Sequence, residues 1–226
     1  MAKRRKRPKK KKSFGIFKAL LLVLVLAAVN IGLVSAIMQH RTGDSGVSLD
    51  GEKRGNAAYA ASRPELDVQL LTPNPNSRPQ IPLRRLNGIV IHYTANPGSS
   101  AMQNRNYFEG LKDGGTKASS HFIIGIDGEI VQCIPSSEIA YASNSRNDDT
   151  LSIECCHPDE SGKFSEETYD SLVELTAWLC RYFDISPDEV IRHYDVTGKL
   201  CPKYYVENED AWEDLLADIK EAYDAM

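Results

Sequence analysis

The sequence predicts an α/β domain with a mixed central β-sheet flanked by helices, preceded by a single N-terminal transmembrane helix. Three observations predict this class: a charge-free apolar run near the N-terminus, short apolar runs of strand length, and longer segments with apolar residues at helical spacing. Strands that alternate with helices along a chain are typical of α/β domains. With 226 residues, 42% of them apolar, the chain has room for one substantial domain and a tail.

The chain begins with a basic arm, residues 1–18, which holds 10 of the 27 Lys and Arg residues and no acidic residue. The rest of the chain has 17 basic and 31 acidic residues, a net charge of −14. This acidic body argues against nucleic acid as a partner, because phosphate binding requires positive charge on the folded surface. We therefore interpret the arm as a cytoplasmic signal that orients the segment after it.

Residues 19–38 contain no charge and are about long enough to cross a bilayer core of roughly 30 Å as a helix. We predict a membrane anchor with the arm inside the cell and the rest of the chain outside. The alternative is a cleaved signal peptide, because residues 34–36 (VSA) resemble a small-residue cleavage site, and the protein would then be secreted. The anchor is favoured because the apolar part of a signal peptide is usually only about 7 to 15 residues long.

Residues 39–64 are polar and rich in Gly and Ser, without a hydrophobic period, which predicts a flexible stalk. Hydrophobic periodicity begins after Pro64. We therefore place the folded domain at residues 65–226, and we expect it to be a monomer.

The first elements of this domain follow from local patterns. Residues 88–92 (GIVIH) are typical of a strand buried on both faces. A weaker helical pattern covers residues 100–111. Residues 121–126 and 129–134 flank an Asp-Gly pair, which favours a two-residue hairpin turn and predicts two antiparallel strands.

The second half of the domain combines a strand with two amphipathic helices. Residues 151–156 predict a strand whose alternate side chains face opposite sides: Leu151, Ile153 and Cys155 on one, Ser152, Glu154 and Cys156 on the other. Ser165 is a helix cap, and the apolar residues after it recur at helical spacing as far as Tyr182. A last helix is predicted from about residue 209 to 223.

Three residues carry donor atoms that suit a metal ion. His92 ends the first strand, His193 follows an apolar pair, and Cys201 comes eight residues later. Catalytic zinc takes three protein ligands and keeps a fourth position open for water. Each residue alone is also typical of an ordinary core position, because a lone buried Cys behaves as a small apolar residue.

The five cysteines make an odd number. In an exported chain, at least one is therefore free, paired to another chain or bound to metal. Cys201 is the one with a reason to be left out. The pairing of the other four stays open: Cys133, Cys155, Cys156 and Cys180.

The candidate ligands fall within four ordered blocks: residues 89–95 (IVIHYTA), residues 118–125 (ASSHFIIG) followed by Asp127-Gly128, Asn147 leading into residues 152–154 (SIE), and residues 192–202 (RHYDVTGKLCP). From about Leu86 to the C-terminus, the chain resembles the zinc N-acetylmuramoyl-L-alanine amidases, a superfamily that includes phage lysozyme-type amidases and animal peptidoglycan-recognition proteins. The resemblance implies their fold, Zn²⁺ as cofactor and peptidoglycan or muropeptides as substrate. It implies cleavage of the amide bond between N-acetylmuramic acid and L-alanine.

Carried over residue by residue, the resemblance implies five roles: His92, His193 and Cys201 as zinc ligands, Glu154 as the general acid/base, and Lys199 as the oxyanion stabiliser. The chemistry agrees, because zinc lowers the pKa of its water to about 7. Glu154 can take the proton of that water and give it to the leaving amine. Lys199 can offset the charge that develops on the carbonyl oxygen.

The chain departs from the family at Ser120, where some members have a catalytic Tyr, so that the acid/base role rests on Glu154 alone. His121 lies on the predicted hairpin strand and is a candidate for lining the cleft and contacting substrate, but packing in the core is the favoured interpretation. Substrate-binding residues of the family fall in the loop before the Glu154 strand, which predicts substrate contacts for three residues: Tyr141, Asn144 and Asn147.

Two other functions fit parts of this pattern. One is a non-catalytic peptidoglycan-binding module, because some peptidoglycan-recognition proteins keep the groove and lose the zinc cysteine. The presence of Cys201, Lys199 and Glu154 favours the enzyme. The other is a zinc peptidase that cuts within the peptide stem, which the same metal chemistry permits and which product analysis distinguishes.

Overall fold

The computed structural model describes residues 57–226, except for the side chains of residues 57, 58 and 61. The predicted arm at residues 1–18, the anchor at residues 19–38 and most of the stalk lie outside the described residues. Within the described part of the chain, no helix is both long and apolar enough to cross a membrane.

The domain is built on one six-stranded sheet in the order β1-β4-β3-β5-β2-β6. Its strands are β1 (Asp67–Val68), β2 (Gly88–Tyr93), β3 (Phe122–Ile124), β4 (Ile130–Gln132), β5 (Thr150–Cys155) and β6 (Val190–Arg192). β3 and β4 pair antiparallel, whereas all other neighbours pair parallel. The predicted mixed sheet is therefore confirmed, and the short edge strands β1 and β6 were not part of the prediction.

The connection between β3 and β4 differs from the predicted two-residue turn. The Gly128 N–H donates to the Gly125 carbonyl oxygen at 3.1 Å, and the Gly125 N–H donates to the Glu129 carbonyl oxygen at 2.8 Å. The prediction is wrong because Asp127 and Gly128 do not form the two central positions: Gly128 follows the turn in the left-handed region, at φ +83. Such a glycine closes a three-residue hairpin loop with a bulge.

The three predicted long helices are confirmed: α2 (Ala101–Gly110), α3 (Glu166–Phe183) and α6 (Glu209–Ala225). Ser100 and Ser165 cap α2 and α3 by accepting hydrogen bonds from backbone N–H groups of their first turns. Shorter elements complete the described chain: α4 (His193–Thr197), α5 (Lys203–Glu207), and the 3-10 helices η3 (Ala57–Ser62), η4 (Leu111–Asp113), η5 (Asn144–Arg146) and η6 (Pro187–Glu189).

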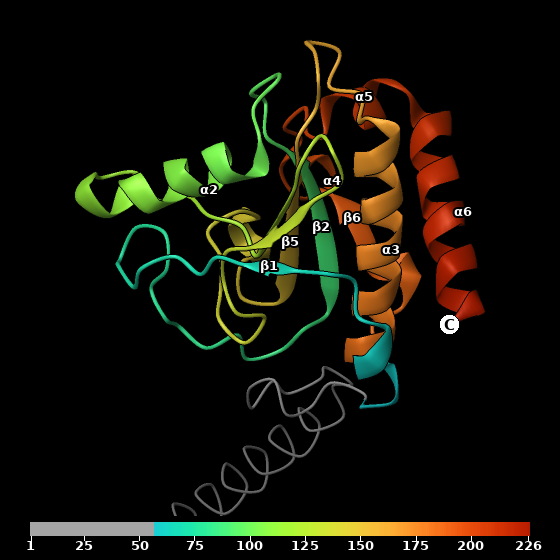
Figure 1. Ribbon diagram of the computed structural model, residues 1–226, viewed down its shortest axis with the longest axis horizontal. Coiled ribbons are helices and arrows are strands. Elements are labelled where there is room, and N and C mark those ends of the chain that lie inside the picture. Colours follow the sequence, from blue (N-terminus) through green and yellow to red (C-terminus); the bar gives the residue numbers. More distant parts are fainter. Residues whose placement is uncertain (1–56) are drawn as a thin grey trace, which may run out of the picture. The chain divides into compact units, whose positions relative to one another are not determined.

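Helices cover both faces of the sheet. α3 (orange) and α6 (red) stand side by side beyond one face, and α2 lies beyond the other (Figure 1). Alternate residues of β5 divide between two apolar clusters, as predicted: Leu151, Ile153 and Cys155 belong to the cluster that contains α3 and α6. Cys156, just past the strand, belongs to the cluster that contains α2.

The folded part of the chain begins before residue 65, so the predicted end of the stalk is too late. Residues of η3 contact α3. The indole Nε1 of Trp178 donates to the Tyr59 carbonyl oxygen at 2.8 Å, and the Arg181 guanidinium lies 5.8 Å from the centre of the Tyr59 ring. The small residues of this segment carry too weak a hydrophobic period for sequence analysis to detect.

All five cysteines lie in the described part of the chain, and all five are buried and unpaired. The adjacent Cys155 and Cys156 fall in different clusters on opposite faces of the sheet. The structure therefore answers the open question of pairing, because none of the cysteines forms a disulfide.

Candidate functional site

The candidate site lies at the carboxyl ends of the central parallel strands, where ligands bind in open α/β sheets. In the pairing of β2 with β5, His92 lies directly opposite Glu154. Directly opposite residues of neighbouring strands point to the same face, so strand pairing alone brings these two side chains together. His193 is the first residue of α4, immediately after β6, the other neighbour of β2.

Three buried side chains, those of His92, His193 and Cys201, offer ligand atoms that all lie within 4.8 Å of one another. The Cys201 sulfur is 3.9 Å from Nδ1 of His92, and the two imidazole rings have their centres 4.5 Å apart. Two imidazoles and a thiol within this distance form a donor set that suits zinc.

One ring nitrogen of each histidine contacts a residue that does not belong to this cluster. Nε2 of His92 is 3.2 Å from the Ser143 hydroxyl, and Nε2 of His193 is 2.9 Å from Oδ1 of Asn144. Nδ1 of His193 is buried and has no hydrogen-bond partner among the described residues. A buried polar atom without a partner is costly, so this nitrogen is suited to bind a metal ion.

Electrostatics keep both histidines neutral. Burial holds the pKa of His92 well below its ordinary value, and the nearby His193 and Lys199 lower it further. Burial and the charge of Lys199 also lower the pKa of His193. A neutral imidazole has the free lone pair that a metal requires.

The Cys201 thiol is also uncharged in the absence of a cation. Burial, with the charge of Glu154, raises its pKa to about 12. Metal binding at this position must therefore displace the thiol proton. The Tyr194 N–H donates to the Cys201 carbonyl oxygen at 2.8 Å, which fixes the cysteine against the first turn of α4.

Glu154 stands beside the cluster without belonging to it. Its Oε1 is 4.0 Å from Nδ1 of His92, and its side chain is 17% exposed. Its Oε2 is buried and has no hydrogen-bond partner among the described residues. Burial raises the pKa of this carboxyl to about 8, against the opposing effect of Lys199. A carboxyl group in such a position can exchange a proton near neutral pH.

The segment that carries His193, Lys199 and Cys201 is anchored by Arg192. Its guanidinium donates to Asp195 at 3.0 Å, to Glu209 at 2.7 Å and to the Tyr205 carbonyl oxygen at 3.0 Å. These contacts join the end of β6 to α4, α5 and α6. Arg192 therefore fixes the strand end from which His193 projects.

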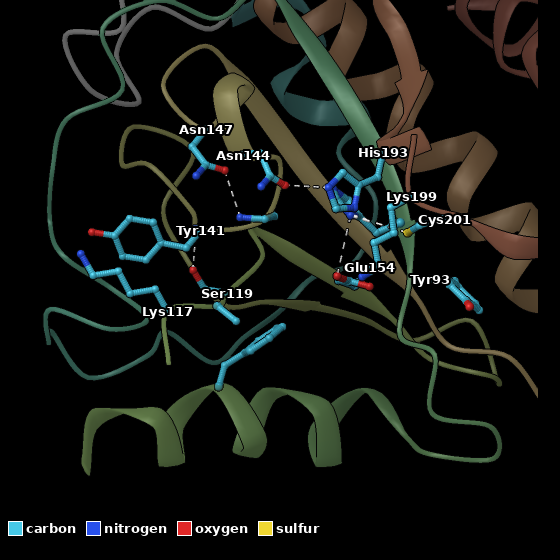
Figure 2. A pocket seen from close by; sticks show the side chains of 14 residues that line it. Tyr93, Lys117, Ser119, Tyr141, Asn144, Asn147, Glu154, His193, Lys199 and Cys201 are labelled. Atoms are coloured by element: carbon cyan, nitrogen blue, oxygen red, sulfur yellow. Dashed lines mark hydrogen bonds and ion pairs between the residues drawn. The ribbon is translucent and has the colours of Figure 1, made fainter. Parts of the chain in front are cut away.

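The cluster forms one end of a cleft of about 450 Å³, a size that suits a small ligand or part of a polymer. Figure 2 shows His193, Cys201, Glu154 and Lys199 gathered on one side, with Tyr141 and Lys117 on the other. The Lys117 ammonium lies 5.1 Å from the centre of the Tyr141 ring. The lining has two lysines and one carboxylate, so it is suited to a substrate with negative charge.

Comparison with known proteins identifies the family. A family model described as N-acetylmuramoyl-L-alanine amidase matches residues 82–204, which is more than half of the chain. The chain belongs to the N-acetylmuramoyl-L-alanine amidase family. The matched residues of this amidase-family chain include the whole His, His and Cys cluster and Glu154.

Individual proteins with similar sequences have the same family name. A probable N-acetylmuramoyl-L-alanine amidase of Bacillus licheniformis is 36% identical over 146 residues, which cover 59% of this chain and 41% of that protein. The N-acetylmuramoyl-L-alanine amidase BlyA of Bacillus subtilis (strain 168) is 29% identical over 168 residues, which cover 65% of this chain and 44% of that protein. The aligned part of the chain thus spans less than half the length of either relative.

Solved structures share the fold. The structure of PlyL aligns with a TM-score of 0.59 at 22% identity, covering 69% of this chain and 97% of that chain. At this level of identity, the likeness concerns the fold. It confirms the family's α/β architecture, with a central sheet and flanking helices, for the amidase-family chain described here.

Eight of the nine predicted site residues line this cleft of the amidase-family chain: the catalytic candidates Glu154 and Lys199, the substrate candidates Tyr141, Asn144 and Asn147, and the ligand candidates His92, His193 and Cys201. Asn147 also has a structural role, since its Oδ1 accepts hydrogen bonds from the N–H groups of Ala142 and Ser143. Substrate contact by Tyr141, Asn144 and Asn147 stays a prediction.

Of the two interpretations of His121, packing in the core is confirmed, and its assignment as a substrate-binding residue that lines the cleft is wrong. Its side chain is completely buried, and both ring nitrogens have partners within the fold. The Ser152 N–H donates to Nδ1 at 3.0 Å, and Nε2 donates to the Glu138 carbonyl oxygen at 2.9 Å. Burial lowers the pKa of His121 to about 4, so it is a neutral core residue.

Ser120, which stands where some amidases have a catalytic Tyr, also faces the interior. Its hydroxyl lies 2.9 Å from the backbone carbonyl oxygen of Phe122 and 2.9 Å from that of Ser152, and it donates its one hydrogen to this pair of acceptors. No proton-transfer group therefore replaces the missing Tyr at this position. Glu154 is the only carboxyl group that lines the cleft among the described residues.

Sequence reasoning missed two residues of the site. Ser143, which contacts His92, is a small polar loop residue with no local pattern that points to a metal. Lys117 lies just before the second sequence block, but nothing nearby distinguishes it from other exposed lysines. Both become visible only when the loops before β3 and β5 are seen to meet at the cleft.

Proposed function

We propose that this protein is a zinc-dependent hydrolase that cleaves the amide bond between N-acetylmuramic acid and L-alanine in peptidoglycan. The observation that carries the proposal is the cluster of His92, His193 and Cys201 beside Glu154 at one end of a cleft. Membership of the amidase family and the names of the relatives support the same reaction.

The residues present fit a zinc ion. Cys201 and the Nδ1 atoms of His92 and His193 would be its protein ligands. A cation there would give the buried Nδ1 of His193 the partner that it lacks among the described residues. Three protein ligands are the usual number at a catalytic zinc, which leaves one position for the reacting groups.

Bound zinc would act as a Lewis acid and make water a nucleophile at neutral pH. Glu154, 4.0 Å from His92, would accept the proton of the attacking water and pass it to the nitrogen of L-alanine as the amide bond breaks. Lys199 would place its ammonium group near the carbonyl oxygen and offset the negative charge that develops there.

The positive character of the cleft supports an anionic substrate such as the peptide stem of peptidoglycan. Lys117 and Lys199 stand on opposite sides of the cleft, whereas the chain beyond its N-terminal arm has a net charge of −14. Tyr141, Asn144 and Asn147 provide a phenol and two amides for hydrogen bonds with peptide or sugar.

We further propose that residues 19–38 anchor the protein in the cell membrane as a single span, with the domain outside the cell as a monomer. The basic arm and the charge-free run support this orientation. Cleavage of the segment as a signal peptide would instead give a secreted enzyme.

Product analysis tests the proposed reaction. The full chain in detergent is incubated with purified peptidoglycan, with and without a chelator, and the products are identified by mass spectrometry. We expect new L-alanine amino ends while the sugar chains stay intact, and we expect the chelator to abolish the release of amino ends and added zinc to restore it. Cuts within the peptide stem would indicate a zinc peptidase, and binding without cleavage would indicate a non-catalytic module.

A further inference from the structure

The loop before β5 contacts both histidines of the cluster from outside. Ser143 and Asn144 are adjacent in sequence, and each reaches the Nε2 atom of a different histidine, His92 and His193. Figure 2 shows the Asn144 amide turned toward His193 at the edge of the cleft. We propose that Ser143 and Asn144 are positioning residues that hold His92 and His193 in the tautomer whose Nδ1 is free to bind zinc. This inference rests on the proposed zinc site.

The contact to His193 fixes a proton. An amide oxygen only accepts hydrogen bonds, so Oδ1 of Asn144 at 2.9 Å requires the hydrogen of His193 to be on Nε2. A neutral imidazole with hydrogen on Nε2 has its lone pair on Nδ1. That Nδ1 is the buried atom without a partner among the described residues, and it faces the cluster.

The contact to His92 is compatible with the same tautomer, because the Ser143 hydroxyl can accept a hydrogen bond from Nε2. Ser143 is 1% exposed, so its hydroxyl has little access to water and meets Nε2 of His92 at 3.2 Å. With hydrogen on Nε2, Nδ1 of His92 has its lone pair directed toward the Cys201 sulfur, 3.9 Å away. In this tautomer, both histidines present Nδ1 to the ion.

The backbone at Asn144 explains why an Asn occupies this position. Its φ is +53, in the left-handed region, where Asn and Asp are found much more often than other residues with a side chain. Glycine fits this backbone but has no acceptor, whereas most residues with an acceptor do not fit the backbone. Asn and Asp meet both demands.

The rest of the loop holds these two residues in place. Oδ1 of Asn147 accepts the N–H of Ser143, and Nε of Arg146 donates to Oδ1 of Asp149 at 2.7 Å. The Thr150 hydroxyl at the start of β5 donates to the Arg146 carbonyl oxygen at 2.6 Å. The loop is thus tied to the strand that carries Glu154, so its position relative to the cluster is defined.

The test measures zinc affinity of the full chain by competition with a chelator, without substrate. Asn144→Gly removes the acceptor without backbone strain, and we expect about 10-fold to 100-fold weaker zinc binding. Ser143→Ala should weaken binding within the same range. Ser145→Gly is the matched control, because Ser145 is an exposed neighbour in the same loop and does not line the cleft. It should bind zinc as the unmodified protein does.

Two further variants distinguish the effect of the Asn144 acceptor on zinc binding from the effects of loop geometry and of charge. Asn144→Asp keeps both an acceptor and the left-handed backbone, and should bind zinc at least as tightly as the unmodified protein. The double variant N144G/S145D places the same charge one residue away and should stay weak.

A second readout needs no metal. In the zinc-free unmodified protein, nitrogen NMR of the imidazole rings should find hydrogen on Nε2 of His193, and Asn144→Gly should give a mixture of tautomers. Zinc binding by Asn144→Gly within about 2-fold of the unmodified protein, or hydrogen on Nδ1 of His193 in the zinc-free protein, would overturn the inference. If the unmodified protein itself binds no zinc, the proposed function fails instead.

Discussion

At the residue scale, the division of labour between His92, His193, Cys201 and Glu154 follows from their surroundings. The two histidines are buried and neutral, and the cysteine must lose a proton to bind a cation. Glu154 is close to the cluster but also open to the cleft. Three groups are thus suited to hold an ion and one is suited to move a proton.

Glu154→Gln should separate binding from chemistry. Gln has the same size as Glu but cannot accept the proton of water, so we expect unchanged zinc content and a rate lower by about 10²-fold to 10⁴-fold. Metal analysis and release of L-alanine amino ends on one preparation measure both quantities. Turnover close to that of the unmodified protein would mean that another group handles the proton.

Lys199→Ala should reduce the rate by about 10²-fold to 10³-fold, by analogy with the loss of one oxyanion donor. If Lys199 and Glu154 stabilise the same transition state, the double variant should be little slower than the slower single variant. Rate measurements on the three variants decide this. Losses that multiply would show that the two residues act in separate steps.

At the element scale, sequence patterns located β2, β3, β4, β5 and the three long helices, because each has a clear hydrophobic period or a cap such as Ser165. The same patterns missed β6, α4 and α5. These elements are three to five residues long, and they are held by long-range contacts such as those of Arg192 with Tyr205 and Glu209. The hydrophobic period of a short segment carries no information about such contacts.

The β3-β4 turn provides a stability test. Gly128 has φ +83, and a Cβ there would lie 2.9 Å from the Glu167 carbonyl oxygen of α3. Gly128→Ala should therefore lower the free energy of unfolding by about 1 to 3 kcal/mol. Gly115→Ala is the matched control, because a Cβ there meets nothing within 4 Å, and it should be nearly neutral. Equal urea midpoints for the two variants would contradict this account of the turn.

The docking of α2 provides a pH test. Burial would raise the pKa of Glu109, but hydrogen bonds from the Thr72 N–H and Lys112, with the charge of Arg105, lower it to about 2. Because the folded pKa lies below the unfolded value, the stabilisation is present above about pH 4.3 and is lost as the pH falls toward 2. Glu109→Gln should therefore cost about 1 kcal/mol at pH 7 and progressively less below pH 4. A cost that does not change with pH would contradict this role.

At the scale of the whole molecule, the sequence predicted the mixed sheet, the helices and the ligand set, because strand ends and sequence blocks mark them. It favoured packing of His121 in the core but could not identify its hydrogen-bond partners, since Ser152 and Glu138 belong to two other segments. It also could not predict Ser143 beside His92, which requires the loop before β5 to close over β2. Local sequence patterns therefore predict where strands and helices lie. The roles of individual side chains depend on contacts between loops that are distant in the sequence.

The proposed membrane anchor at residues 19–38 can be tested by fractionation. If residues 19–38 are an uncut anchor, the full-length protein of an expressing bacterium should fractionate with the membranes, and external protease should remove the domain. The physical reason is that this charge-free run is about long enough to span the bilayer core. A soluble secreted form that begins near Ile37 would show instead that a signal peptidase removes the segment.

The central claim is that zinc at His92, His193 and Cys201 makes this chain an amidase. Its most direct test is a titration of zinc into the metal-free full chain, with the rate of L-alanine amino-end release from peptidoglycan plotted against bound zinc per chain. We predict a linear rise that ends at one zinc per chain, and little bound zinc or activity in Cys201→Ala. Full activity without zinc, or undiminished zinc binding and turnover in Cys201→Ala, would contradict the claim.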